Sequence, residues 1–214
     1  MGVLGGLIGG LTARQLSKLR GQAVFACVMV LPLVVGFGEQ GRSQQEVRRV
    51  ESTIEIEAAP DVVWRNIERV PAIAPKELPK TWTQRIGFPR PIEATLSYEG
   101  LGGVRHATFE RGVLFIETVD VWEPERKLAF SIHADKIPAT ALDEHVTIGG
   151  KYFDVLHGEY RTEPLDAARV RLHLVSEHRV STDFNWYAHL WTDAVMRDVQ
   201  REILQVIRKR CEKK

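Results

Sequence analysis

The sequence has few of the residues that mark common chemical sites. It contains two cysteines, Cys27 in an apolar stretch and Cys211 near the chain end, too few for a disulfide framework. Its seven histidines are scattered, and no His-x-x-x-His or Cys-x-x-Cys spacing predicts a metal site. A serine-nucleophile elbow is absent, and the glycines of residues 100–103 precede a predicted strand instead of a phosphate-cradling helix. We therefore expect no cofactor, no metal and no serine-hydrolase or nucleotide-binding chemistry.

The charge balance argues against a nucleic-acid partner. Lysine and arginine together number 29 and aspartate and glutamate 28, which gives a net charge of +1 with the signs interspersed. Nucleic-acid binding normally needs a basic face. The cations of residues 208–210 and 213–214 are interpreted as suiting the C-terminal end of a helix dipole. The length of 214 residues suffices for one domain with a sizeable core plus an appendage.

Residues 21–38 contain no charged side chain. A run of this length is at the lower limit for spanning a bilayer, where about 20 residues are typical. Arg14, Lys18 and Arg20 precede the run, and positive residues are favoured on the cytoplasmic side of a membrane. The sequence therefore predicts an N-terminal hydrophobic helix and a single-pass membrane protein. Its N-terminus would be cytoplasmic and its globular domain outside.

Two other interpretations of this N-terminal region stay open. It could be a secretory signal peptide, with residues 34–36 as a poor cleavage site, or a buried or disordered leader on a soluble protein. Residues 39–49 are polar without apolar periodicity and are typical of a linker. We place the anchor and linker in residues 1–45 and the globular domain in residues 46–214.

The globular part begins with a strand and a helix. Residues 50–57 alternate in polarity as a half-buried strand does, and a helix over residues 58–67 has Pro60 in its first turn. The prolines of residues 70–92 indicate a short helix and an irregular loop. A long amphipathic helix is predicted to begin between residues 183 and 185. Between these helices, turn residues separate six strand candidates, namely residues 93–98, 103–110, 113–122, 127–134, 151–162 and 169–180.

Several short segments in this order resemble the SRPBCC superfamily of START, polyketide cyclase/dehydrase and plant-allergen-like domains. They read IEIEAAPDVVW at residues 54–64, GGVR at 102–105, ETVDVWEP at 117–124 and LAF at 128–130, followed by the long terminal helix. The resemblance implies an α+β helix-grip fold, in which a curved antiparallel sheet wraps around the C-terminal helix in the order β-α-α-β6-α. Such folds enclose a cavity, but they serve lipid carriers, hormone receptors, aromatases and cyclases alike.

Glu117 is the first candidate for a role in that cavity. Strand alternation places it in a row with Phe115 and Val119, where it is the polar member among apolar side chains. A buried carboxylate needs a partner, or its pKa rises. It could therefore act as a general base, bind a ligand hydroxyl, or pair with an arginine for structural reasons.

The other cavity candidates come from later segments. Tyr160 could bind a ligand through its hydroxyl, and His178 could be an acid or base, although a histidine at a strand end is also ordinary. Ser176 shares a strand face with His178. Tyr187 and Trp191 belong to the apolar stripe of the last helix and could line one end of the cavity or simply pack in the core.

The leading hypothesis is a membrane-tethered domain that binds a hydrophobic small molecule or lipid in an internal cavity. Its partners would be that molecule and, through residues 21–38, the membrane. A second hypothesis is a polyketide cyclase/aromatase-type enzyme, which the resemblance also allows. A third is a non-catalytic interaction domain with a filled core. Whether the chain is an enzyme is left open by the sequence.

Overall fold

The computed structural model describes residues 45–137, 148–182 and 185–212. The predicted anchor, residues 21–38, lies outside these ranges, and so does the hydrophobic helix expected there. No helix within the described ranges is long and apolar enough to cross a membrane. Residues 44–214 form one compact unit, which contains every element described below.

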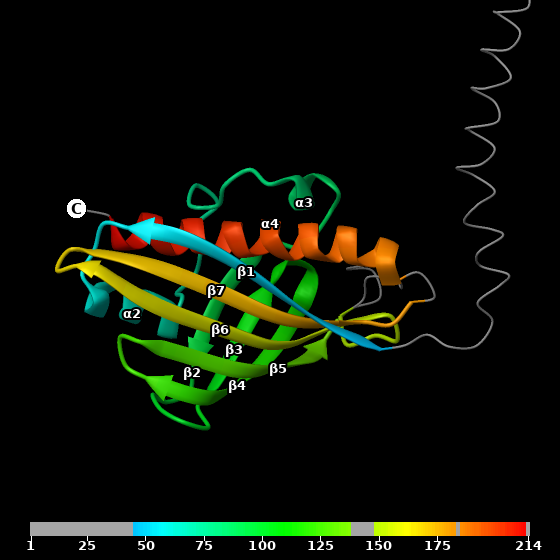
Figure 1. The fold of residues 1–214 in the computed structure, drawn as a ribbon, viewed down its shortest axis with the longest axis horizontal. Coiled ribbons are helices and arrows are strands. Elements are labelled where there is room, and N and C mark those ends of the chain that lie inside the picture. The colour runs from blue at the N-terminus through cyan, green and yellow to red at the C-terminus, as the bar shows by residue number, and fades with distance from the viewer. Residues whose placement is uncertain (1–44, 138–147, 183–184, 213–214) are drawn as a thin grey trace, which may run out of the picture. The chain divides into compact units, whose positions relative to one another are not determined.

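The unit is built on one seven-stranded antiparallel sheet in the order β1-β7-β6-β5-β4-β3-β2 (Figure 1). Two helices and a long C-terminal helix complete it, so the predicted order β-α-α-β6-α and the helix-grip fold are confirmed. The first strand, β1, pairs along its whole length with the last, β7, although more than 100 residues separate them. The strands are β1 Glu46–Ile56, β2 Pro91–Leu96, β3 Val104–Phe109, β4 Val113–Glu123, β5 Lys127–Lys136, β6 Phe153–Asp166 and β7 Arg169–Val180. The helices are α2 Pro60–Glu68, α3 Trp82–Arg85, the 3-10 turn η1 Glu110–Gly112 and α4 Asn185–Cys211.

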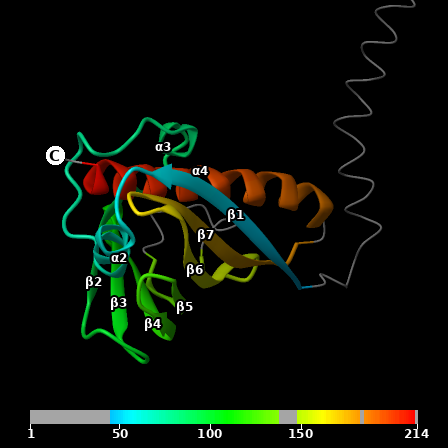
Figure 2. The same ribbon diagram turned by 60° about the vertical axis from the view of Figure 1, so that its left-hand side comes forward.

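Irregularities in the strand pairing help to curve the sheet. The register shifts between Val119 and Val121 on β4 and between Val155 and His157 on β6. A bulge of this kind bends its strand and increases the local twist. Figure 2 shows the result, in which β2 to β5 curl away below α4 and leave a concave face toward the helix.

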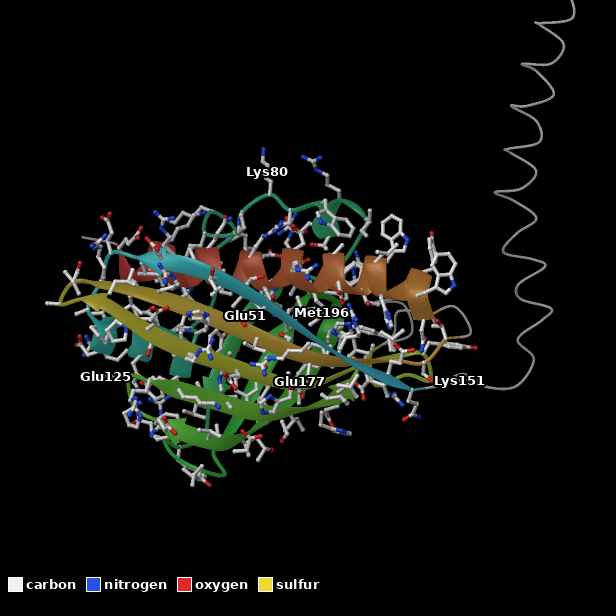
Figure 3. All side chains as sticks on the ribbon, viewed as in Figure 1. Glu51, Lys80, Glu125, Lys151, Glu177 and Met196 are labelled. Carbon is white, nitrogen blue, oxygen red and sulfur yellow. The ribbon has the colours of Figure 1, made fainter. Side chains whose placement is uncertain are left out.

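The opposite face of β1, β6 and β7 is polar and carries ion pairs. Arg171 lies 2.8 Å from Glu55 and 3.2 Å from Glu163, and a further pair joins Arg161 to Glu51 at 3.2 Å. Figure 3 shows Glu51 and Glu177 on this face of the sheet. Exposed pairs of this kind contribute little to stability, but they explain why these strands alternate in polarity.

Three clusters of buried apolar side chains lie between the sheet and the helices. The largest joins α2 and the C-terminal half of α4 to the middle of the sheet through residues such as Ile67, Leu172 and Leu204. The second surrounds Phe115 on β4, and the third contains Met196 on α4, which Figure 3 labels. All three clusters contribute residues to the wall of a cavity.

Candidate ligand-binding cavity

A cavity of about 140 Å³ lies between α4 and the concave face of the sheet. Its walls draw on all three apolar clusters, with Phe115 from β4, Phe130 from β5 and Met196 from α4 among them. Apolar cavities of about 150 Å³ can stay dry and hold a molecule the size of benzene. The further apolar residues of the lining are Phe88, Pro89, Pro91, Phe109, Val113, Ile132, Ile148, Phe153, Val155, Leu174, Val195, Val199 and Ile203.

Gly158 on β6 leaves room for an aromatic ring in the wall of this cavity. It lies on β6 opposite Phe130, and a Cβ atom built on it would stand 2.6 Å from Cε2 of the Phe130 ring. That separation is too short for two carbon atoms, so the ring occupies the space that a side chain at residue 158 would need. Because residue 158 has no side chain, the Phe130 ring can pack against β6 and form part of the cavity wall.

Glu117 lies on the cavity wall, but it is already paired. Arg105 on β3 donates to its carboxylate at 2.5 Å, and both side chains are buried. Burial raises the pKa of Glu117, while the charge of Arg105 and its hydrogen bond act in the opposite direction. This geometry matches the structural interpretation of Glu117, in which an arginine satisfies it.

Arg105 also ties this pair to α2. Its Nε donates to the carbonyl oxygen of Glu68 and its second terminal nitrogen to that of Ile67, both at 3.2 Å. These carbonyls belong to the last turn of the helix, where backbone acceptors lack partners within the helix. The guanidinium also lies 5.0 Å from the centre of the Phe130 ring. Arg105 thus joins α2, β3, β4 and β5 beside the cavity, and the sequence analysis did not identify it.

Tyr160 stands beside this pair. Burial raises the pKa of its phenol to about 12, with Glu117 acting in the same direction and Arg105 against it, so the hydroxyl stays protonated near neutral pH. A second cavity of about 60 Å³ shares Tyr160 and Glu117 with the first and has Arg105 in its own lining. The two residues therefore mark the boundary between an apolar chamber and a smaller chamber with a charged wall.

α4 contributes two buried polar side chains to the cavity wall that the sequence analysis missed, Gln200 and Glu202. Gln200 donates through Nε2 to the carbonyl oxygen of Val50 and to Oγ of Ser176, both at 3.0 Å. Its Oε1 atom has no hydrogen-bond partner among the described residues. Ser176 lines the cavity, and Gln200 connects it to β1.

Glu202 is the other missed residue of the cavity wall. Its side chain is only 3% exposed, and it accepts a hydrogen bond from the amide of Gln84 on α3. Burial raises its pKa from the ordinary 4.5 to about 7. One turn earlier on α4, Asp198 accepts from the backbone N–H of Thr83 at 3.0 Å and from its hydroxyl at 2.8 Å. The sequence contains one signal for these residues: Asp198 and Glu202 are four residues apart, so they lie on the same side of the predicted helix.

Two predicted cavity residues are buried elsewhere. Val119 packs in the largest core cluster and is not part of the cavity lining. His178 is fully buried beside Phe153, with Nε2 3.2 Å from the hydroxyl of Thr192 and 3.7 Å from the carboxylate of Asp193. Burial lowers its pKa to about 4, so the imidazole is neutral near pH 7. The prediction that His178 faces the cavity is therefore wrong, although it is not a surface residue either.

The prediction that Tyr187 and Trp191 line the cavity is also wrong. Their side chains are 51% and 53% exposed, and neither belongs to the lining. The first turns of α4 contact β1 through polar side chains: Arg48 donates to Asp193 at 2.8 Å, and His189 lies 3.1 Å from Glu46. The apolar stripe is consequently turned to the outside at this end, and it becomes the buried face only from Val195 onward.

The cavity offers a ligand apolar walls and a few polar groups. These groups are the neutral phenol of Tyr160, the ion pair of Arg105 with Glu117, and the carboxyl group of Glu202, whose pKa is about 7. Within residues 45–137, 148–182 and 185–212, no group of three histidine, cysteine, aspartate or glutamate side chains could hold a metal ion. The arrangement suits the enclosure of an apolar molecule, with a few polar contacts to orient it.

Comparisons with known proteins agree with this architecture. No family model matches the chain, and no curated protein matches it either. Among solved structures, a START superfamily protein from Mycobacterium smegmatis superposes with a TM-score of 0.50 at 10% identity, covering 77% of this chain and 97% of that one. The aromatase/cyclase ZhuI from a Streptomyces species gives a TM-score of 0.46 at 19% identity, covering 77% of this chain and 94% of the other. Norcoclaurine synthase from Thalictrum flavum gives 0.46 at 14% identity, covering 81% and 99%.

The likeness to the Mycobacterium smegmatis protein, at a TM-score of 0.50, establishes the class of fold. The chain has a START-like helix-grip domain, in which a curled antiparallel sheet holds a long C-terminal helix. At such low identity the likeness extends to the fold and leaves the ligand and any reaction to be argued from the cavity.

Proposed function

We propose that this domain binds a hydrophobic small molecule or lipid in the cavity beneath α4. The observation that carries the proposal is a cavity of about 140 Å³ with mainly apolar walls. Burial of apolar surface contributes about 25 cal/mol for each Å² removed from water. Because Arg105 already satisfies Glu117, the ion pair can stay in place while an apolar ligand enters.

The size of the cavity restricts the bound group. A volume of about 140 Å³ suits one ring or a short branched chain, and the second chamber of about 60 Å³ beyond Tyr160 could take a small extension. A larger lipid would need α4 or the segment around Phe88 and Pro89 to move outward. The existence of the cavity argues against the hypothesis of an interaction domain with a filled core.

We propose further that residues 21–38 tether the domain to a membrane. The support is the uncharged run itself and the basic residues before it, Arg14, Lys18 and Arg20. The N-terminus would be cytoplasmic and the binding domain on the other side. Washing of membranes with alkaline carbonate should leave the full-length protein in the pellet, and its release into the supernatant would contradict the tether.

An enzyme of the cyclase/aromatase type is the second candidate. The observation in its favour is Glu202, because a general acid or base works best with a pKa near the working pH, and the pKa of Glu202 is about 7. If the domain were such an enzyme, a polyketide-like substrate should be converted by the wild type and left unchanged by Glu202→Gln. A binding domain would return the same molecule that it took up.

Native mass spectrometry of the detergent-extracted, full-length protein tests the binding proposal. The wild type should carry an apolar small molecule that dissociates on activation. Val199→Phe would fill the cavity from α4, whereas Arg201→Phe places the same side chain on the exposed side of the helix. We expect the first variant to lose the molecule and the second to retain it. Equal occupancy in both variants, or a wild type that binds no apolar molecule at all, would overturn the proposal.

A further inference from the structure

Two ionisable carboxyl groups line the larger cavity, and their partners differ. Glu117 is in an ion pair with Arg105 at 2.5 Å. Glu202 accepts from an uncharged amide, that of Gln84. Within the described ranges, Glu202 has a hydrogen bond from Gln84 and no ion pair with a lysine, arginine or histidine, although the residue is only 3% exposed. A carboxylate buried without a cation is costly, which is why such groups are more frequent at functional sites than in ordinary cores.

The elements around Glu202 provide no cation in direct contact with it. Gln84 faces it from α3, and Asp198 precedes it on α4 but is occupied by the two donors of Thr83. The charge of Arg90 favours the ionised form of Glu202, while the charges of Asp198 and Glu110 disfavour it. A carboxylate has room for about four hydrogen bonds. Gln84 supplies one of them, so the group retains acceptor capacity.

The position of Glu202 on α4 determines which part of a bound ligand could donate a hydrogen bond to its carboxyl group. Val195, Val199 and Ile203 follow one another at helical spacing and, together with Met196, form the apolar part of the helix that lines the cavity. Glu202 lies three residues after Val199, on the edge of this stripe that faces α3. A ligand that packs its apolar body on the stripe would bring a group at its edge to the Glu202 carboxyl.

On this basis we propose that Glu202 anchors the polar end of the ligand, and that the ligand is an apolar molecule with one hydrogen-bond donor, a hydroxyl or an amine. The inference rests on the proposed binding function. It adds the chemical class of the ligand and the residue that selects it. Glu117, by contrast, is occupied by Arg105 and contributes to the shape of the cavity.

The charge state of Glu202 distinguishes the two kinds of donor. Its pKa of about 7 means that the ionised form increases between pH 6 and pH 8. A ligand ammonium group, which stays charged across this range, should bind more tightly as the carboxylate forms. A hydroxyl can donate to either form and should show a weaker dependence on pH.

Three probes of similar size test the proposal on the detergent-solubilised full chain: toluene, benzyl alcohol and benzylamine. Titration calorimetry at pH 6 and pH 8 should show that at least one of the donor-bearing probes binds about tenfold or more tightly than toluene, as a hydrogen bond to a charged group implies. Glu202→Leu should abolish this preference while toluene still binds. Gln205→Leu, the same replacement on the exposed side of α4, should leave it unchanged.

Each result separates the anchor from the cavity. If toluene does not bind the wild type, the proposed binding function fails. If toluene binds but neither donor is preferred, or if the preference survives in Glu202→Leu, the proposed role of Glu202 is overturned. The proposed binding of apolar molecules in the cavity would then still hold. Should Glu202→Leu fail to fold, Glu202→Gln preserves a neutral side chain of the same size. In that variant any increase in benzylamine affinity between pH 6 and pH 8 should vanish, and its persistence would overturn the anchor.

Discussion

Arg105 and Glu117 face each other across neighbouring strands at the position where β3 and β4 pair, with guanidinium and carboxylate 2.5 Å apart. Both are buried, and Arg105 also holds the final carbonyls of α2. One ion pair thus connects the wall of the cavity to the helix that follows the first strand. A buried pair of this kind is worth little compared with apolar residues, but breaking it leaves an uncompensated charge.

Glu117→Gln should therefore lower the free energy of unfolding by about 3–5 kcal/mol, the usual cost of removing one partner of a buried pair. Affinity for toluene should remain within a few-fold of wild type. Denaturant unfolding measures the first quantity and calorimetry the second. Glu123→Gln, on the same strand but exposed, is the matched control. A Glu117→Gln variant as stable as this control would show that the pair has no structural role.

The stability of the protein should depend on Glu202 in a defined pH window. Its folded-state pKa is raised from 4.5 to about 7, so between these values the folded protein holds a proton that the unfolded chain has released. Stability should accordingly fall as pH rises from 4.5 to about 7, by on the order of 3 kcal/mol. In Glu202→Gln this loss should be absent. Parallel curves for the two proteins between pH 4.5 and pH 7 would contradict the assignment.

His178 should have the opposite effect. Its folded-state pKa is lowered from 6.5 to about 4, so on acidification the unfolded chain takes up a proton before the folded protein does. Its contribution to stability should be complete above pH 6.5 and lost as pH falls toward 4. His178→Gln should remove this acid-side loss, whereas His106→Gln, an exposed control, corrects for the removal of a histidine. If the His178 and His106 variants show the same acid response, His178 is not buried as described.

The two ends of α4 should respond differently to truncation of a large side chain. Leu204 is buried in the main core cluster, so Leu204→Ala should cost about 2–5 kcal/mol. Trp191 is half exposed, and Trp191→Ala should change stability by no more than about 0.5 kcal/mol. Denaturant midpoints of both variants decide the matter. A large loss at Trp191 would restore the interpretation that the apolar stripe is buried along the whole helix.

The sheet could be predicted from sequence because strand alternation and turn residues are local signals. Phe115 and Glu117 were correctly placed on the inner face of β4 by period-two alternation alone, and both line the cavity. The partner of Glu117 was less accessible. Arg105 lies on a different strand, and only the pairing of β3 with β4 brings it opposite Glu117.

α4 was harder to predict because its buried face mixes polar and apolar residues. Hydrophobic periodicity includes Tyr187 and Trp191 in the apolar stripe and leaves Gln200 and Glu202 out of it, whereas in the structure the first two are exposed and the last two are buried. The polar residues are buried because their partners come from distant segments: Val50 for Gln200, and Gln84 for Glu202. The partners in such contacts are more than 100 residues apart in the sequence, so the periodicity within one helix cannot indicate them. The anchor at residues 21–38 stays a prediction.

The close approach of Gly158 to the Phe130 ring means that residue 158 controls how much space the ring leaves for a ligand. Any larger residue at 158 would displace the ring, and Phe130 itself forms part of the cavity wall. Gly158 also belongs to the cavity wall, so a methyl group added there would reshape the cavity both directly and by displacing the phenylalanine ring. A protein engineer who wanted a narrower binding repertoire would begin at residue 158.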